Sequence, residues 1–448
     1  FLQAELPDLP ARHHSLRAIF EYSWQTLSPV EQSCFSRLAI FRSSFSAEAA
    51  MAVAGASLAI LTRLHRVNLL QRQDDFERFS IHELLRQFAR AKLAQSMPDP
   101  AMLQRRHAEY FLTWLGRQTQ ILEGVQPTRH AEAIQAVLDD LRFAWQWASA
   151  AGTMDLLGRA ASVLGAFYQT RGMYGEGERL FRATLAQISA QEAGLRGQLL
   201  VRLGTYLEKQ GKLEAARTTL NEGLALAQRL HDYASLGLGY HALARVHFAT
   251  STAAEAIQIL RRGLADLPEG ESLTPRAELL IYLGTLEADL GNREASAKAY
   301  AEVRRIVART GNKVQEQRLF LVQGVDMVDE DYAAAYFYLD RALALSPDSG
   351  DRAIEARILN ALGFIQARWG NYAEAIRYHL RGLAICTADQ DALQQSHAMH
   401  NLCVDHYGLG QYEEAYFYGQ EALAIAERKD LPDGIGYAQL HLGHVLAE

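Results

Sequence analysis

The sequence predicts a mainly α-helical protein in which a stack of repeated helix pairs fills about two thirds of the 448 residues. A residue pair recurs with its second residue at 165, 204, 244, 284, 323, 363, 403 and 443, a period of 39 or 40 residues. The pair is Leu-Gly in five of these places, Leu-Ala at 244, Leu-Cys at 403 and a degenerate Val-Gln at 323. A small residue follows twelve positions after seven of these pairs, and apolar residues make up 49% of the chain. Such a period is typical of stacked repeats, because each unit buries its apolar face only against a neighbour.

Other positions keep the same phase. A Gly lies seven residues after the pair in most units, and Pro268 and Pro347 end two of them. The pattern resembles the tetratricopeptide repeat (TPR), two antiparallel helices whose small residues let the helices approach closely. The usual unit has about 34 residues, so a period near 40 predicts longer helices or loops. We assign 153–448 to a TPR superhelical solenoid of about seven repeats plus the start of an eighth.

The chain in front of the repeats begins with a linker and continues as a small helical domain. Residues 1–10 hold Pro7 and Pro10 and are assigned to a linker remnant. Apolar residues then recur at helical spacing from Ser15. A capping box, Ser28-Pro29-Val30-Glu31, predicts the start of a second helix, and third and fourth helices are expected from 46 and over 57–66.

The pattern then changes to that of a short β-hairpin. Residues 69–72 and 76–81 are expected to be strands around a polar turn at 73–75, and a closing helix is expected from His82 to Gln95. Helices, a two-stranded wing and a closing helix predict a winged-helix domain over 11–97. Pro98-Asp99-Pro100 marks the next boundary. Aromatic-rich helices over 102–122 and 129–150 predict a packed helical connector over 98–152.

Composition narrows the classes of function. The net charge is −7, and the basic residues of the predicted recognition helix, Arg63, His65 and Arg66, form only a small cluster, which disfavours nucleic-acid binding. Three Cys at unrelated spacings favour a reducing, cytoplasmic setting. The longest weakly polar stretch, 49–61, is too short to span a bilayer, so no membrane association is expected. The chain opens on Phe1 and stops inside a repeat, so we expect it to be part of a longer protein.

Several segments carry a family pattern, namely Arg12–Arg17, Tyr22–Ser28, Arg37–Phe41, Phe45–Ala50, Phe79–Ala89 and Leu138–Ala148. The first five resemble the winged-helix part of STAND signal-transduction ATPases, the NB-ARC-like class found in many bacterial regulators. The sixth resembles the stretch that joins this module to a TPR sensor. The resemblance implies that the winged helix packs on a nucleotide-binding domain of the same chain.

The resemblance also implies a role for one histidine. In that family a Met-His-Asp-like motif places its His against the β-phosphate and helps to hold the ADP-bound resting form. Ile81-His82-Glu83 occupies this place, so His82 is the expected nucleotide contact, with Ile for Met and Glu for Asp. An imidazole at a helix start can donate to phosphate. The alternative is that His82 only caps its helix or fills a polar niche under the wing.

No phosphate-binding loop of the Gly-x-x-x-x-Gly-Lys-Ser/Thr type is present, so we do not expect this sequence itself to hydrolyse ATP. ADP or ATP would be the cofactor of the longer protein, which would self-assemble on activation. We expect no cofactor or catalytic residue here. His397 and His400 lie one helical turn apart, but no further placed ligand suggests a metal site.

The repeats offer a candidate ligand face. With TPR phasing, the first helix of each repeat turns inward the positions six and three residues before the second residue of the pair, and one and four after it. These positions select His241, Arg245, Phe248, Arg357, Asn360, Phe364, His397, His400, Tyr407, Tyr437 and His444. Aromatic, His, Arg and Asn side chains carry much of the energy of binding interfaces. The alternative is an ordinary wetted surface.

These observations favour the arm and sensor of a STAND-type regulatory ATPase. An inducer, which is a peptide, a protein or a small molecule, would bind the concave TPR face and shift the winged helix, so that ADP exchanges for ATP. Two alternatives remain open. One is a constitutive TPR scaffold without nucleotide control, and the other is DNA binding through the winged helix.

Overall fold

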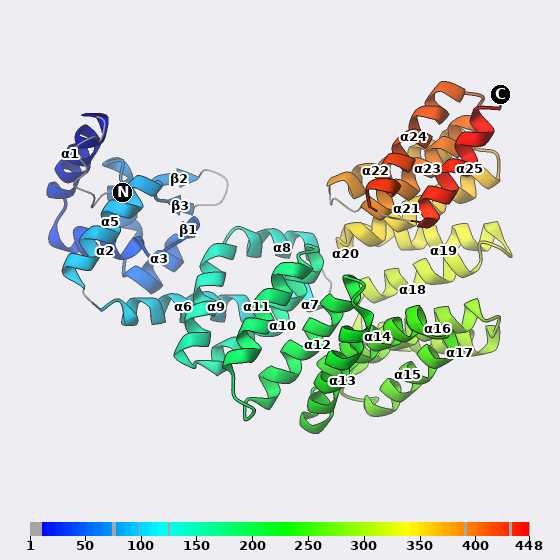
Figure 1. Cartoon of the computed structure of the whole chain (residues 1–448), viewed down its shortest axis with the longest axis horizontal. Helices are drawn as coiled ribbons and strands as arrows, with labels where there is room; N and C mark the ends of the chain where they lie inside the picture. Colours follow the sequence, from blue (N-terminus) through cyan, green and yellow to red (C-terminus); the bar gives the residue numbers. More distant parts are fainter. Residues whose placement is uncertain are drawn as a thin grey trace. The chain divides into compact units, whose positions relative to one another are not determined.

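The computed structural model describes residues 11–73, 78–97, 99–123, 126–388, 392–429 and 432–447 (Figure 1). The predicted linker at 1–10 and the polar turn at 74–75 lie outside these residues. The described chain forms two compact units, which we describe separately. Unit 1 comprises 11–119 and 130–206, and unit 2 comprises 120–129 and 207–447, within those ranges. The predicted domain boundaries stay predictions.

The N-terminal part of unit 1 contains five helices, and their start signals act as the sequence predicts. The helices are α1 (Ala11–Gln25), α2 (Pro29–Leu38), α3 (Ala47–Ala54), α4 (Leu58–Arg66) and α5 (Glu83–Ser96). Ser28 and Glu31 form the predicted capping box, with Ser28 N donating to Glu31 Oε2 over 2.7 Å. The hydroxyls of Ser46 and Ser57 cap α3 and α4 by accepting hydrogen bonds from the backbone N–H groups of Ala49 and Ile60. Local sequence therefore fixes where these helices begin.

Three short strands complete this part. They are β1 (Phe45–Ser46), β2 (Gln71–Gln73) and β3 (Arg78–Ser80), and they form one antiparallel sheet in the order β1-β3-β2. The sequence predicts only the hairpin of β2 and β3, with longer strands, and misses β1, which pairs Phe45 with Phe79. The element order agrees with that expected of a winged helix, and the winged-helix assignment stays a prediction.

Aromatic side chains hold α1 against the rest of this domain. The Trp24 ring lies edge-on to Phe88 of α5, with 6.0 Å between ring centroids, and 6.2 Å from Phe35 of α2. The Lys92 ammonium lies 5.3 Å from the Trp24 ring centroid and pairs with Glu21 over 2.8 Å. These contacts bury large apolar areas, which is the main source of stability for so small a domain.

The connector is helical, as predicted, but more interrupted. In place of two long helices the structure has α6 (Ala101–Gly116), α7 (Gln120–Glu123), α8 (Pro127–Gln135) and α9 (Leu138–Ala151). The helix expected over 102–122 therefore breaks after Gly116, and the one expected over 129–150 breaks at 136–137. Gly116 lies close to α10, because a Cβ atom there would lie 3.0 Å from Arg159 O.

The repeats form consecutive helix pairs. The first helices are α10 (Met154–Thr170), α12 (Ala193–Lys209), α14 (Tyr233–Thr250), α16 (Leu273–Asp289), α18 (Lys313–Asp326), α21 (Arg352–Arg368), α23 (Ala392–Gly408) and α25 (Pro432–Val445). The second helices are α11 (Tyr174–Gln187), α13 (Leu213–Leu230), α15 (Ala253–Asp266), α17 (Arg293–Thr310), α19 (Tyr332–Ala344), α22 (Tyr372–Ala388) and α24 (Tyr412–Arg428), with a short α20 (Ser346–Ser349) after α19. Pro347 thus lies inside α20 instead of ending its unit.

The repeated glycines have the two roles that the pattern predicts. Gly172, Gly211, Gly291, Gly370 and Gly410 all have φ between 65° and 81° and form the turns between paired helices. Such a backbone conformation is costly for residues with a Cβ atom. Gly284 and Gly363 instead lie under Tyr300 and His379 of the following second helices, where a Cβ atom would overlap the ring. In the degenerate unit the residue with this role is Gly324, which lies under Leu339, and not Gln323.

Within unit 2, the helices form two layers. Consecutive first helices from α14 to α25 contact one another, whereas each second helix contacts its own first helix and the first helix of the next repeat. One core cluster of this type joins Leu321, Leu339, Ile358 and Leu362 from α18, α19 and α21. The first helices therefore form the inner layer of the stack, where TPR phasing places a ligand face.

Over the described parts of the chain, no single helix has both the length and the apolar character to cross a bilayer, and the one pair that passes such a test jointly, α3 and α4, is bent by 105°.

Candidate functional site

The first helices of unit 2 carry a row of charged side chains that pair across neighbouring repeats. Arg245 of α14 bonds to Glu208, near the end of α12, with 2.9 Å from Nε to Oε1. Arg318 of α18 bonds to Glu278 of α16 over 2.8 Å and lies 3.6 Å from Asp351, which caps α21. We call these five side chains the charge ladder. It places a continuous polar strip on the inner layer.

The ladder is partly enclosed by protein, and its ionisation reflects this. Burial acts to raise the pKa of the Glu278 carboxyl, but Arg318, His241 and a hydrogen bond from Gln315 together hold that pKa below its usual range. Glu278 in turn raises the pKa of the Arg318 guanidinium. Gln315 is almost fully buried, and its Nε2 donates to Glu278 Oε1 over 3.2 Å and to Thr274 O over 2.9 Å. The buried Gln315 amide therefore helps to hold the ion pair of Glu278 and Arg318 in place.

Arg357 extends the row by one helix. It lies on α21 with an exposed side chain, and its guanidinium forms no hydrogen bond or ion pair within the described part of the chain. Burial by surrounding protein lowers the pKa of Arg357, Arg318 and Arg245 lower it further, and Asp351 opposes them. At the other end of the row, burial and then Arg245 lower the pKa of Lys209. Among the described side chains, the cations of the strip therefore outnumber its acids.

Two amide side chains lie one turn further along. Asn401 Nδ2 of α23 donates to Asn360 Oδ1 of α21 over 2.8 Å. The backbone oxygen of Asn360 lies 3.2 Å from His379 Nε2, and His379 Nδ1 lies 2.6 Å from Asp405 Oδ2, both side chains being 1% exposed. Asn360 is therefore anchored through the core, while its Nδ2 group remains available to a ligand.

Aromatic and histidine rings continue the face towards α25. The His400 ring lies 5.5 Å from the Tyr437 ring and 4.7 Å from the His441 ring. Burial lowers the pKa of His400 to about 4, and the neighbouring His441 and His397 act in the same direction. Tyr437 itself is 56% exposed.

The other predicted residues fall into four groups. The His241 ring packs against Tyr282 at a tilt, with 5.2 Å between ring centroids, and burial lowers the pKa of His241 to about 4. The rings of Phe248 and Phe364 are 48% and 40% exposed and free to contact a ligand. Tyr407 differs, because its ring lies 5.7 Å from Tyr412, at the turn between α23 and α24. The remaining selected histidines are the half-buried His397 and the exposed His444.

Sequence reasoning found only Arg245 of the five side chains in the ladder. Glu208 and Glu278 occupy inward positions of the TPR phasing, but the selection considered only aromatic, His, Arg and Asn side chains. Arg318, Asn401 and His441 were missed because each lies one residue away from an inward position of the TPR phasing. A search for oppositely charged residues one repeat apart would have found the pairs of Glu208 with Arg245 and of Glu278 with Arg318.

His82 lies exposed at the start of α5. Its Nδ1 accepts a hydrogen bond from Leu84 N over 3.3 Å, so it caps the helix. With Nδ1 as acceptor, the neutral ring carries its proton on Nε2, which can donate to an external group. Next to it, Arg86 donates to the backbone oxygens of Arg42 and Ile81 and pairs with Glu83. Capping and an outward donor role are therefore compatible.

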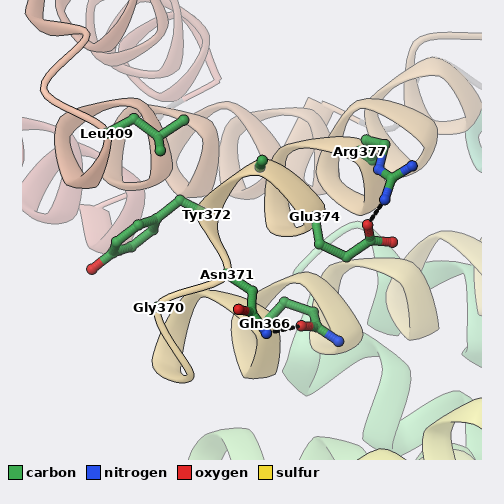
Figure 2. Close-up of a pocket in the computed structure, with 8 residues that line it drawn as sticks. Gln366, Gly370, Asn371, Tyr372, Glu374, Arg377 and Leu409 are labelled. Carbon is green, nitrogen blue, oxygen red and sulfur yellow. Dashed lines mark hydrogen bonds and ion pairs between the residues drawn. The ribbon is translucent and has the colours of Figure 1, made fainter.

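A shallow depression of about 490 Å³ lies elsewhere, at the turn between α21 and α22 (Figure 2). Its lining includes Gln366, Asn371, Glu374, Arg377 and Leu409. Figure 2 shows that its polar groups already bond to one another: Asn371 Nδ2 donates to Gln366 Oε1 over 2.9 Å, and Arg377 pairs with Glu374. It therefore offers fewer free groups than the inner layer. Across the described residues, no cluster of three or more His, Cys, Asp or Glu is placed to hold a metal ion.

Comparison with known proteins adds information on the fold. No family model matches the chain, and no curated protein matches it. Among solved structures, it is similar to a signal-transduction ATPase with a tetratricopeptide repeat sensor from Pyrococcus horikoshii, with 14% identity, a TM-score of 0.48, and coverage of 94% of this chain and 67% of that one. It is also similar to a tetratricopeptide repeat protein from Parabacteroides merdae, with 13% identity, a TM-score of 0.39, and coverage of 63% of this chain and 98% of that one. A third similar structure is that of a Rap protein complexed with competence and sporulation factor, with 12% identity, a TM-score of 0.48, and coverage of 76% of this chain and 98% of that one. At such identities the likeness concerns the helical-repeat fold alone.

Proposed function

We propose that this chain is the arm and sensor of a STAND-type regulatory ATPase. In this proposal the inner layer of unit 2 binds an inducer, and the N-terminal domain uses His82 to hold the ADP-bound resting state of a nucleotide-binding domain. The observation that carries the proposal is the inner layer itself. It joins the charge ladder, the Asn360–Asn401 pair and exposed Phe248, Phe364 and Tyr437 rings on consecutive first helices.

The physical reason is that these side chains contribute little to folding where they are. Exposed aromatic rings and paired surface charges add little to stability, whereas aromatic and Arg side chains dominate binding energy at interfaces. A ligand that bridges several first helices would favour one curvature of the stack over others. Such differential affinity is what a sensor needs to shift a conformational equilibrium.

The inducer half of the proposal is tested by capture from extracts of the source organism with quantitative mass spectrometry. Replacing Phe248, Phe364 and Tyr437 by Ala should remove specific partners. Replacing Phe337 and Phe417 by Ala is the matched control, because these rings are 54% and 56% exposed but belong to second helices. Partners that survive the first set of changes and are lost with the second would place binding on the outer layer and contradict the proposal.

The nucleotide half is tested on the full-length protein by release of fluorescent ADP. His82→Ala should speed release by roughly tenfold, the cost of about one charge-assisted hydrogen bond. His444→Ala, a change of an exposed His on α25, should leave release unchanged. Equal release from the His82 variant and the native protein would instead support a constitutive scaffold without nucleotide control.

A further inference from the structure

A backbone contact within unit 2 joins two segments that are far apart in the sequence. Gln126, the residue before α8, donates its backbone N–H to Ser349 O, at the end of α20, over 2.6 Å. Gly350 follows, and a Cβ atom on it would lie only 2.8 Å from Gln126 Cα. The two segments therefore approach this closely only because residue 350 has no side chain. We call Gln126, Ser349 and Gly350 the latch.

Both sides of the latch have an unusual backbone. Gln126 has a φ of 43°. A left-handed backbone is costly for a residue with a Cβ atom and persists only where surrounding contacts impose it. Gly350 has a φ of 62° and ends α20, a short helix that the other repeats lack among the described residues. An irregular helix and a strained residue thus meet at one point.

On one side the latch adjoins the charge ladder. Asp351, the residue after Gly350, lies 3.6 Å from Arg318, and its backbone N–H donates to Ser349 Oγ over 3.3 Å. The Ser349 side chain is completely buried, so this connection is enclosed by protein. A ligand that draws Arg318 away from Asp351 therefore acts on a residue that is bonded to the latch.

On the other side the latch continues into α8. This helix begins at Pro127, directly after Gln126, in the part of the chain that belongs to unit 2. Its later residues belong to unit 1, where Ala131 and Ile134 are completely buried. A helix is stiff over such a length, because hydrogen bonds link each turn to the next. A displacement of Gln126 is therefore passed along α8 to the connector.

We propose that the latch is a conformational switch, which holds the start of α8 on α20 in the ligand-free state and opens when a ligand displaces Arg318 from Asp351. The inference rests on the proposed function of the inner layer as the ligand face, and it adds the route by which occupancy of that face reaches the connector. Strain at Gln126 favours opening, whereas its hydrogen bond to Ser349 opposes opening, so a ligand shifts a balance between two opposed contributions.

The first test measures hydrogen exchange at the Gln126 amide in the full chain, by mass spectrometry that resolves single residues. Gly350→Ala should speed this exchange by roughly threefold to tenfold, because the added methyl group displaces Gln126 and frees its amide. Gly311→Ala is the matched control, since Gly311 ends α17 with a φ of 66° and has open space around it. Unchanged exchange in the Gly350 variant, or equal acceleration in both variants, overturns the latch.

A cysteine pair closes the latch instead of opening it. A Cβ atom on Gly350 would lie 3.2 Å from Gln126 Cβ. Disulfides join Cβ atoms about 3.5–4.5 Å apart, so Gln126→Cys with Gly350→Cys should cross-link on mild oxidation after a small shift. The native cysteines do not compete, because Cys34, Cys386 and Cys403 are buried. Gln126→Cys with Gly311→Cys should not cross-link, and a Gly350 pair that stays reduced contradicts the contact.

The coupling to the charge ladder is tested without an identified ligand. Arg318→Met removes the charge beside Asp351, as a competing ligand would, and should speed exchange at Gln126 by roughly fivefold or more. Arg261→Met is the matched control, because Arg261 pairs with Glu287 over 2.7 Å and not with a ladder residue, and it should leave that exchange unchanged. Exchange that does not respond to Arg318→Met, or responds equally to both changes, overturns the inference.

Release of fluorescent ADP from the full-length protein separates this inference from the proposed function. The oxidised Gln126–Gly350 cysteine pair should slow release by roughly fivefold or more, and a reductant should restore it. If His82→Ala speeds release but closing the latch leaves it unchanged, the switch is overturned and the proposed function stands. If His82→Ala and closing the latch both leave release unchanged while Arg318→Met still opens the latch, nucleotide control fails and the route from ladder to connector stands.

Discussion

His107 Nε2 lies 2.8 Å from Asp140 Oδ1, and both side chains are completely buried. Asp140, in the first turn of α9, also accepts hydrogen bonds from the backbone N–H groups of Arg42 and Ser43, each over 2.8 Å. One carboxylate thus ties the segment after α2 to α6 and α9 of the connector. The guanidinium of Arg42 lies 4.6 Å from the Phe143 ring centroid and covers the same junction.

Removing this carboxylate should destabilise unit 1 strongly. Asp140→Ala leaves His107 and two backbone N–H groups buried without their acceptor, and we expect it to lower the free energy of unfolding by about 3–5 kcal/mol. Asp139→Ala is the control, because Asp139 is an exposed neighbour that pairs with Arg142 on the surface, and it should cost less than about 1 kcal/mol. Chemical denaturation followed by circular dichroism measures both, and equal effects would contradict the assigned role.

The small residue of the Leu-Gly pair should matter only where a second helix covers it. Gly363→Ala places a methyl group against His379, so overpacking should cost about 1–3 kcal/mol. Gly443, at the same phase on α25, has open space around it, and Gly443→Ala should stabilise that helix by up to about 1 kcal/mol. Opposite shifts of the thermal midpoint are expected, and a gain of stability in both variants would indicate that backbone freedom, not the covering helix, decides.

Acid should weaken unit 2 in part through His400. Its pKa is about 4 in the fold against a usual value of 6.5, so the unfolded chain binds a proton first as the pH falls. The stability from this group is present above about pH 6.5 and is lost towards pH 4. His400→Gln should reduce the loss between pH 7 and 5 by about 1 kcal/mol after allowance for solvent screening. The control is His444→Gln, and denaturant midpoints at the two pH values report the difference.

Asp326 should have the opposite pH dependence. Burial raises the pKa of this carboxyl to about 6 from a usual 3.8, although Tyr300 donates a 2.7 Å hydrogen bond to it. The folded protein therefore holds a proton that the unfolded chain has released, and ionisation costs stability as the pH rises through 6. Asp326→Asn should stabilise the protein by about 1–2 kcal/mol at pH 7 and have little effect at pH 4. The exposed Asp329→Asn is the control, and a gain that is equal at both pH values would refute this account.

The sequence predicts those features that depend on local backbone chemistry. The caps at Ser28, Ser46 and Ser57 and the positive-φ turn glycines are confirmed, because capping and left-handed turns need specific residues at fixed positions. Strand β1 was missed because two residues show no alternation. The break between α8 and α9 was also missed, since nothing in the apolar pattern there ends a helix.

The candidate site depends on pairs far apart in the sequence, and such pairs leave a weaker trace. The same holds outside the candidate site, where the pairing of Asp140 with His107 in unit 1 spans 33 residues, and an acid in a first helical turn is common enough to pass unnoticed. On the inner layer, Arg245 was selected by residue type, whereas Arg318 escaped because its repeat is offset by one residue. The same offset of one residue explains why Gly324, and not Gln323, lies under Leu339 in the core of this repeat.

The match between Gly363 and His379 also limits how such an array can be recombined. A repeat could be exchanged for another only if the small residue and the side chain that covers it move together. A crossover inside the turn after α21 would combine a first helix with a second helix whose side chain at this contact has the wrong size. Duplications and deletions that respect whole units, about 40 residues at a time, are the changes that this architecture tolerates.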